Sequence, residues 1–309
     1  MSLWLVDWNY KASIEEASYI NKGIENIQLF TTYFDQDYNL YQSHDAKQLI
    51  DQTFSHNALK SNDVYLTIIN DQFISQHQVI QKNPEILTNL LSTKLTKEEH
   101  IQQIIKIAKQ YPYEGVEIDY EKIPIDSVQA YCAFLEELNR ELKKINLSLR
   151  VVLEPSFPIE SADLPQDIQY VVMAYNLFGY HSGPGPKLNY EYLEKLTNKL
   201  SKTNLDVSIA LATGGFKWSD KEIDDLTEQE VQQIIDDYPV NPSKDPYSDA
   251  MYFTYTDRNN NQHEVWYANN STLQAWISYL KSKNFYEISI WRAGGLSTNT
   301  LDLLKLFPN

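Results

Sequence analysis

The sequence predicts an α/β protein, a (β/α)8 TIM barrel with a small α+β insertion after the seventh strand. Three observations predict this fold. Eight short apolar runs rich in Val, Ile and Tyr recur along the chain, and stretches of helical periodicity lie between most of them. Alternating strands and helices favour parallel pairing, and a chain of 309 residues accommodates eight such units. No glycine-rich GxGxxG or GxxxxGK turn follows the first strands, which disfavours an open nucleotide-binding sheet.

The elements follow one another regularly. The eight predicted strands lie at residues 3–8, 26–33, 64–70, 115–121, 147–155, 168–176, 205–213 and 286–294. Segments 98–112 and 126–145 place apolar residues three and four apart, as amphipathic helices do. We therefore expect residues 1–309 to form a single barrel domain.

The regular alternation is interrupted between residues 216 and 269, where the chain becomes polar. Residues 251–267 read as a hairpin, because two aromatic strands flank a turn at 257–261. We expect a small α+β insertion at 216–269, on the loop side where barrel sites are built, with a plain surface elaboration as the equal alternative. Trp218 and Trp266 are either outer binding platforms or core residues of this insertion.

The composition disfavours several classes of function. The chain has 42 acidic and 26 basic residues, a net charge of -16, which argues against a nucleic-acid partner. The single Cys132 excludes an internal disulfide and a multi-Cys metal cluster, and the six His show no HExxH spacing, so we expect no metal and no cofactor. No apolar run reaches the roughly 18 residues of a membrane span, and the N-terminal MSLWLVDWNY lacks the layout of a signal peptide.

The most informative segment is YPYEGVEIDYEKIP, residues 111–124. Alternate residues of a strand share a face, so Glu117, Asp119 and Glu121 should point the same way. Neighbours on that face lie roughly 6 to 7 Å apart, close enough to share a proton or to repel. In a barrel the acidic face looks inward, where unpaired charge is costly. This favours a catalytic role for Glu121, at the carboxyl end of the strand, over a solvated edge strand.

The segment resembles the fourth-strand signature DGxDxDxE of the family 18 glycoside hydrolases, which include chitinases, endo-N-acetylglucosaminidases and spore-germination cortex hydrolases. Asp119 and Glu121 match the last two acids of the signature, while Glu114 and Glu117 stand where the family has Asp. Further similarities follow in the same order along nearly the whole chain.

The sixth strand ends in MAYN, residues 173–176, similar to the family's MxYD, with Asn176 in place of the usual Asp. It continues into HSGPGPKLNY, which looks most like the germination and peptidoglycan-acting branch. The eighth strand ends in IWRAGG, so Trp291 resembles the tryptophan on which the family stacks a sugar.

The resemblance implies cleavage of β-linked N-acetylglucosamine glycans, either chitin oligosaccharides or peptidoglycan, by a retaining, substrate-assisted mechanism. Glu121 would act as general acid and then as general base, Asp119 would orient the acetamide N–H, and Tyr175 would donate its hydroxyl to the acetamide carbonyl. The residues expected to bind the substrate are Trp291, Asn176, Glu117 and Glu154. Trp8, Tyr33 and Asn70, which also lie near strand ends, are weaker candidates for lining a sugar cleft.

Two alternatives remain open at this point. One is a carbohydrate-binding barrel with weak or no catalysis, which the exchanges at Glu114, Glu117 and Asn176 leave open. The other is a metal-dependent enzyme with Glu117, Asp119 and Glu121 as oxygen ligands. Because such polymers lie outside the membrane, we expect a secreted or envelope-associated protein whose leader lies outside this sequence, with a cytoplasmic location as the alternative.

Overall fold

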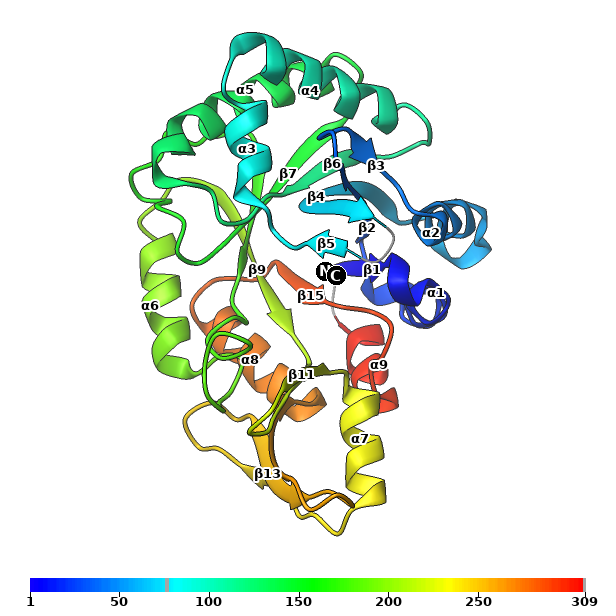
Figure 1. The fold of residues 1–309 in the computed structure, drawn as a ribbon, viewed down its shortest axis with the longest axis vertical. Coiled ribbons are helices and arrows are strands. Elements are labelled where there is room, and N and C mark those ends of the chain that lie inside the picture. Colours follow the sequence, from blue (N-terminus) through cyan, green and yellow to red (C-terminus); the bar gives the residue numbers. More distant parts are fainter. Residues whose placement is uncertain (76–77, 308–309) are drawn as a thin grey trace.

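The computed structural model describes residues 1–75 and 78–307, and it contains the predicted barrel (Figure 1). Each barrel strand overlaps one of the eight predicted runs. The barrel strands are β1 (Ser2–Val6), β2 (Asn26–Asp35), β4 (Asp63–Ser75), β6 (Gly115–Asp119), β7 (Ser148–Leu153), β8 (Gln169–Met173), β9 (Asp206–Ala212) and β15 (Ile288–Trp291).

The barrel closes through parallel pairing alone. Its strands follow the order β2, β1, β15, β9, β8, β7, β6, β4, and β4 pairs in parallel with β2 to complete the circle. Two short antiparallel strands extend the sheet at its rim, β3 (Leu40–Tyr41) beside β2 and β5 (Gln78–Ile80) beside β4. The expected (β/α)8 topology is therefore confirmed.

Helices surround the barrel, as Figure 1 shows for α1 to α6 and for α8 and α9. They are α1 (Tyr10–Tyr19), α2 (His44–Ser55), α3 (Pro84–Leu90), α4 (Lys94–Ala108), α5 (Val128–Lys143), α6 (Tyr190–Leu200), α8 (Asn270–Ser282) and α9 (Thr298–Lys305). Short 3-10 turns lie at Asp7–Asn9, Asn21–Gly23, Asn57–Leu59 and Ile125–Ser127. The connection from β7 to β8, residues 154–168, contains no helix, so one of the eight units is completed by a loop.

The second sheet lies after the seventh barrel strand, where the insertion was expected. It is antiparallel, in the order β11, β10, β14, β13, β12, and α7 (Glu228–Asp237) packs on it. Its strands are β10 (Gly214–Trp218), β11 (Ile223–Leu226), β12 (Ser243–Lys244), β13 (Met251–Thr256) and β14 (Gln262–Ala268). The predicted hairpin is the pair β13 and β14. Figure 1 shows this unit as a separate layer at the lower end of the view.

The buried apolar residues of the barrel form two clusters, one between the strands and the surrounding helices and one inside the barrel. Between strands and helices lies a large apolar cluster that includes Ile118 of β6 and Leu135 of α5. Inside the barrel a smaller cluster, with Trp4 and Met173, adjoins buried polar residues. Over residues 1–75 and 78–307, no helix has both the length and the apolar character needed to cross a bilayer.

Candidate active site

A cleft of about 710 Å³ opens at the carboxyl ends of the barrel strands. Its walls come from distant parts of the chain: Trp8 follows β1, Tyr33 lies on β2, and Phe216 lies on β10 of the second sheet. The predicted site residues that line the cleft are Asp119, Glu121, Tyr175, Asn176 and Trp291.

The acidic segment forms β6 and the turn that follows it. Ile118 packs outward in the large apolar cluster, while Glu117 and Asp119 lie on the opposite face, as the alternation predicted. Gly115 is the first residue of β6, and a larger residue would not fit there, because a Cβ would lie 2.6 Å from the backbone oxygen of Ser148 on β7. The glycine thus lets β6 pair closely with β7.

Glu117 is fully buried below the cleft and does not line it. Its carboxylate accepts hydrogen bonds from Trp4 Nε1 at 2.7 Å, from Thr67 Oγ1 at 2.9 Å and from Arg150 Nε at 2.6 Å. Arg150 is itself buried and donates to Ser289 Oγ at 2.7 Å. The expected contact of Glu117 with substrate is therefore corrected: an ion pair with the neighbouring strand holds this side chain inside the barrel.

Asp119 and Glu121 share one counter-charge. The Lys82 ammonium lies 3.0 Å from Asp119 Oδ2 and 2.9 Å from Glu121 Oε1. The three side chains are only 17%, 7% and 15% exposed, respectively, so solvent screens these contacts weakly. The two acids that the sequence singled out thus meet at one point of the cleft floor.

The proton affinity of this pair is shifted by its surroundings. Burial raises the pKa of Asp119 to about 7, with Lys82 opposing and the nearby Glu121 reinforcing the rise. Asp119 Oδ1 is also buried, and it has no hydrogen-bond partner within the described residues. Asp119 therefore titrates near neutral pH, and its Oδ1 is an acceptor that no described residue uses.

The backbone of Glu121 is held from β4. Asn70 is fully buried, accepts a hydrogen bond from the Glu121 N–H at 3.0 Å and donates to the Glu121 carbonyl at 2.9 Å. Asn70, a weak candidate for lining the cleft, is thus placed behind it. Its amide fixes the turn in which the β6 chain leaves the barrel.

The aromatic floor of the cleft surrounds Trp291. The Trp291 ring lies 5.0 Å from Phe30, 5.9 Å from Trp4 and 6.4 Å from Trp8, measured between ring centroids. Tyr175 lines the cleft next to the two acids, and burial together with the nearby carboxylates raises the pKa of its hydroxyl well above its usual value. This hydroxyl remains a hydrogen-bond donor at any physiological pH.

Glu154, expected to contact substrate, does not line the cleft. Its Oε2 accepts a hydrogen bond from the backbone N–H of Lys122 at 2.6 Å, so it caps the turn after Glu121. Trp218 is also away from the cleft, because it is buried in the second sheet and donates from Nε1 to the carbonyl of Ser182.

Several polar groups of the cleft were not singled out from the sequence, among them Lys82, Asp7 and Lys187. Lys82 lies between predicted elements, with no local pattern to distinguish it. Asp7, at the end of the first predicted strand, accepts hydrogen bonds from Tyr33 at 2.8 Å and from Ser43 at 3.0 Å. Burial lowers the pKa of Lys187 to about 8, and its ammonium donates to the carbonyl of Thr213, between β9 and β10. A charged residue at the end of an apolar run was the one available signal for these three residues, and it was present for Asp7 but not for Lys82 or Lys187.

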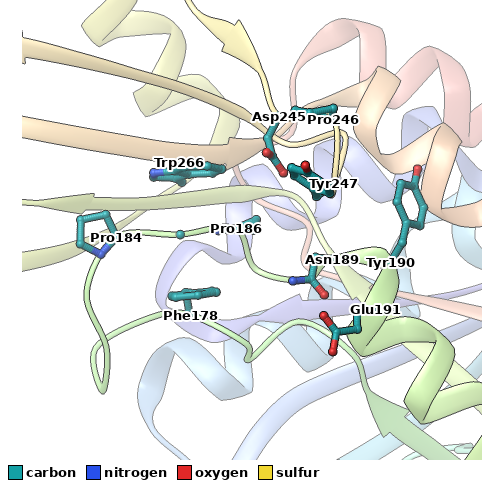
Figure 2. Close-up of a pocket in the computed structure, with 11 residues that line it drawn as sticks. Phe178, Pro184, Pro186, Asn189, Tyr190, Glu191, Asp245, Pro246, Tyr247 and Trp266 are labelled. Atoms are coloured by element: carbon teal, nitrogen blue, oxygen red, sulfur yellow. The ribbon is translucent and has the colours of Figure 1, made fainter.

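A second cavity, of about 510 Å³, lies between the 178–191 segment and the second sheet (Figure 2). Figure 2 shows Pro184 and Pro186 between Phe178 and Trp266, and Tyr247 also lines the cavity. None of its lining residues lines the cleft. The cavity is thus separate from the two acids, and Trp266 belongs to it.

The metal-dependent alternative does not fit this arrangement. Lys82 occupies the position between Asp119 and Glu121 where a bridging cation would bind, and Glu117 is already paired with Arg150. Within residues 1–75 and 78–307, no group of three or more His, Cys, Asp or Glu side chains is arranged to hold a metal ion.

Comparison with known proteins agrees with the resemblance. The uncharacterized glycosylase YvbX of Bacillus subtilis is 24% identical over 230 residues, which cover 69% of this chain and 67% of that protein. The cortical fragment-lytic enzyme of B. subtilis is 24% identical over 229 residues, which cover 66% of this chain and 52% of the enzyme, so the chain spans about half the length of that relative.

A solved structure and a family model complete the comparison. The crystal structure of a chitinase from Chromobacterium violaceum superposes with a TM-score of 0.81 over 99% of this chain and 98% of the other, at 14% identity, which shows a common fold. The model of the glycosyl hydrolases family 18 matches residues 81–295, well over half of the chain. The chain therefore belongs to glycosyl hydrolases family 18 and is a glycosidase.

Proposed function

We propose that this glycosidase hydrolyses β-linked glycans containing N-acetylglucosamine, with retention of configuration and with the substrate's own acetamido group as nucleophile. The observation that carries the proposal is the pair of Asp119 and Glu121 on the cleft floor, where Asp119 has a free buried acceptor. Tyr175 supplies a protonated hydroxyl beside them.

In the first step, the C1–O bond to the leaving sugar breaks while Glu121 transfers its proton to the leaving oxygen. The acetamide oxygen of the same sugar attacks C1, which forms an oxazolinium ion and places a positive charge on the ring. Asp119 Oδ1 accepts the acetamide N–H and its carboxylate offsets this charge, while Tyr175 donates to the acetamide oxygen. No protein nucleophile is consumed.

In the second step, water attacks C1 from the face that the leaving group vacated. Glu121, now a carboxylate, takes the proton from this water, and the C1–O bond to the acetamide oxygen breaks. The product keeps the β configuration, and Glu121 is again protonated. Trp291 supports the apolar face of the sugar throughout, because sugar C–H groups pack against aromatic rings.

The substrate class rests on the chemistry of the site and on the relatives. A free acceptor for an amide N–H selects an N-acetylated sugar over a plain glucan. The similarity to a cortical fragment-lytic enzyme favours an envelope polymer, and the fold shared with a chitinase leaves chitin as the second candidate. We therefore propose peptidoglycan or chitin oligosaccharides as substrates, with action at the cell envelope.

The test compares the wild-type chain with Glu121→Gln. Wild type should release the chromophore from a chitotrioside conjugate, or solubilise N-acetylated peptidoglycan, and EDTA should not change either rate. Glu121→Gln should lose activity by about 10² to 10⁴-fold, because the variant has no proton to give, while it still binds both glycans.

Two outcomes would replace this proposal. If wild type and Glu121→Gln bind both glycans and neither cleaves them, the protein is a carbohydrate-binding barrel, the alternative that the exchanges at Glu114, Glu117 and Asn176 left open. If EDTA abolishes a wild-type activity, the reaction is metal-dependent.

A further inference from the structure

The ion pair of Lys82 with both acids has no part in the two steps above. Within residues 1–75 and 78–307, Lys82 is the only cation in ion-pair distance of Asp119 or Glu121. Its charge is secure, because the surrounding carboxylates raise its pKa despite the opposing effect of its burial. A permanent positive charge therefore lies 2.9 Å from Oε1 of the group that must give up and regain a proton.

Lys82 is held firmly in this place. Its backbone N–H donates to Asp71 Oδ1 at 2.8 Å, and the next residue, Asn83, donates from its N–H to the carbonyl of Asn70 at 2.8 Å. Asn83 also caps α3 by accepting from the N–H of Glu85 at 3.0 Å. Lys82 itself has a φ of 49°, a left-handed conformation that costs energy for a residue with a Cβ. Strained backbone held by several hydrogen bonds indicates a side chain whose position matters.

The other charges around the pair are either paired or farther away. Glu117 lies beneath Asp119 and is paired with Arg150. The carboxylate of Asp71 on β4 and that of Glu154 after β7 interact electrostatically with Lys82. Tyr175 faces the pair as a neutral phenol. Of the charged side chains described around the pair, Lys82 is the one whose removal changes the charge at Glu121 directly.

We propose that Lys82 is a positioning residue that fixes the Glu121 carboxyl in the cleft and stabilises its deprotonated form. The inference rests on the proposed role of Glu121 as general acid and base. When Glu121 passes its proton to the leaving oxygen, its charge changes from zero to -1, and the adjacent ammonium stabilises that new charge. The same contact holds the carboxylate in place until it takes the proton of the attacking water.

This role sets the pH range of activity. The reaction needs one proton on the coupled pair of Asp119 and Glu121, so activity falls at high pH when the pair loses it. A positive charge within about 4 to 6 Å lowers the pKa of a carboxyl group by roughly 1 to 3 units. Without Lys82 the pair keeps its proton to higher pH, so the fall of kcat/KM on the alkaline side, the alkaline limb of the pH profile, moves to higher pH.

The experiment measures kcat/KM against pH for wild type, Lys82→Gln, Lys82→Arg and Lys122→Met, on a chromogenic chitotrioside. Lys82→Gln should move the alkaline limb to a pH higher by roughly 1 to 3 units, and it should lower kcat at the pH optimum by a larger factor than it raises KM. Lys82→Arg keeps the charge and should keep the limb near its wild-type position. Lys122→Met is the matched control: it removes an exposed positive charge one residue after Glu121, and it should shift the limb by less than about 0.5 unit.

The outcomes are separable. If Lys82→Gln has the wild-type alkaline limb, or if Lys122→Met shifts it equally, the inference is wrong. If Lys82→Gln fails to fold, Lys82→Met serves as the neutral variant. Its alkaline limb must then lie at higher pH than that of the charged variant Lys82→Arg by the same roughly 1 to 3 units. If Glu121→Gln is as active as wild type, the proposed function itself fails, whatever the Lys82 variants do.

Discussion

The buried ion pair of Glu117 and Arg150 allows a quantitative prediction about the barrel. The two side chains are 0% and 1% exposed, and Glu117 also accepts from Trp4 and Thr67. Replacing Glu117 by Gln keeps an acceptor for Trp4 and Thr67 but leaves the guanidinium of Arg150 buried without a counter-charge. Breaking a buried pair from one side costs about 3 to 5 kcal/mol, so we expect a loss of that size in the free energy of unfolding.

Urea unfolding followed by tryptophan fluorescence and circular dichroism measures this cost. Arg150→Met should be destabilised similarly, whereas the double variant Glu117→Gln/Arg150→Met should cost at least 2 kcal/mol less than the sum of the two, an order-of-magnitude expectation for residues in direct contact. The control is Glu160→Gln, which breaks the exposed 3.1 Å pair with Lys202 and should cost less than about 1 kcal/mol. A single variant that costs less than about 1 kcal/mol, or additive costs within about 0.5 kcal/mol, would refute this reasoning.

Three further predictions concern pH and positioning. Burial raises the pKa of Asp119 to about 7, and the proposed mechanism needs one proton shared between the coupled Asp119 and Glu121 carboxyls, so wild-type kcat/KM should fall as pH rises above about 7; a profile flat to pH 9 would contradict this. Burial lowers the pKa of His100 to about 3, below its unfolded value, so its contribution to stability is complete above pH 6.5 and is lost as pH falls toward 3. The free energy of unfolding should therefore decrease by up to about 1.4 kcal/mol for each pH unit below 6.5. In urea titrations, the free energy of unfolding of His100→Phe should depend less steeply on pH between pH 6.5 and 5. Asn70→Ala removes both hydrogen bonds to the Glu121 backbone and should lower kcat by roughly 10 to 100-fold with little change in KM; an unchanged kcat would show that the turn holds without it.

Much of the fold followed from local pattern. The strand of residues 115–121 alternates apolar and acidic side chains, and period-two alternation alone placed Ile118 outside the barrel and Asp119 inside. The number of runs, eight, predicted that the sheet closes into a barrel, and no single run did so alone. The loop that replaces a helix between β7 and β8 had no such signature, because the sequence predicted helices between most runs and not between each pair.

The partners of the acids were harder to predict. Arg150 sits directly beside Glu117 in the register of β6 and β7, and a lone arginine inside the apolar strand at 147–155 was a usable signal for this pair. Lys82 offered none, because it lies outside every predicted element and reaches Asp119 only through the tertiary arrangement of β4, β5 and α3. Local periodicity reports which face a residue occupies, but not which residue meets it from another strand.

A crystal structure of Glu121→Gln with a tetramer of N-acetylglucosamine tests the central claim most directly. The account predicts that one sugar ring lies on Trp291, with its acetamide nitrogen about 3 Å from Asp119 Oδ1 and its acetamide oxygen within hydrogen-bond reach of the Tyr175 hydroxyl. A tetramer bound with its acetamide groups away from Asp119, or bound only in the second cavity beside Trp266, would contradict it.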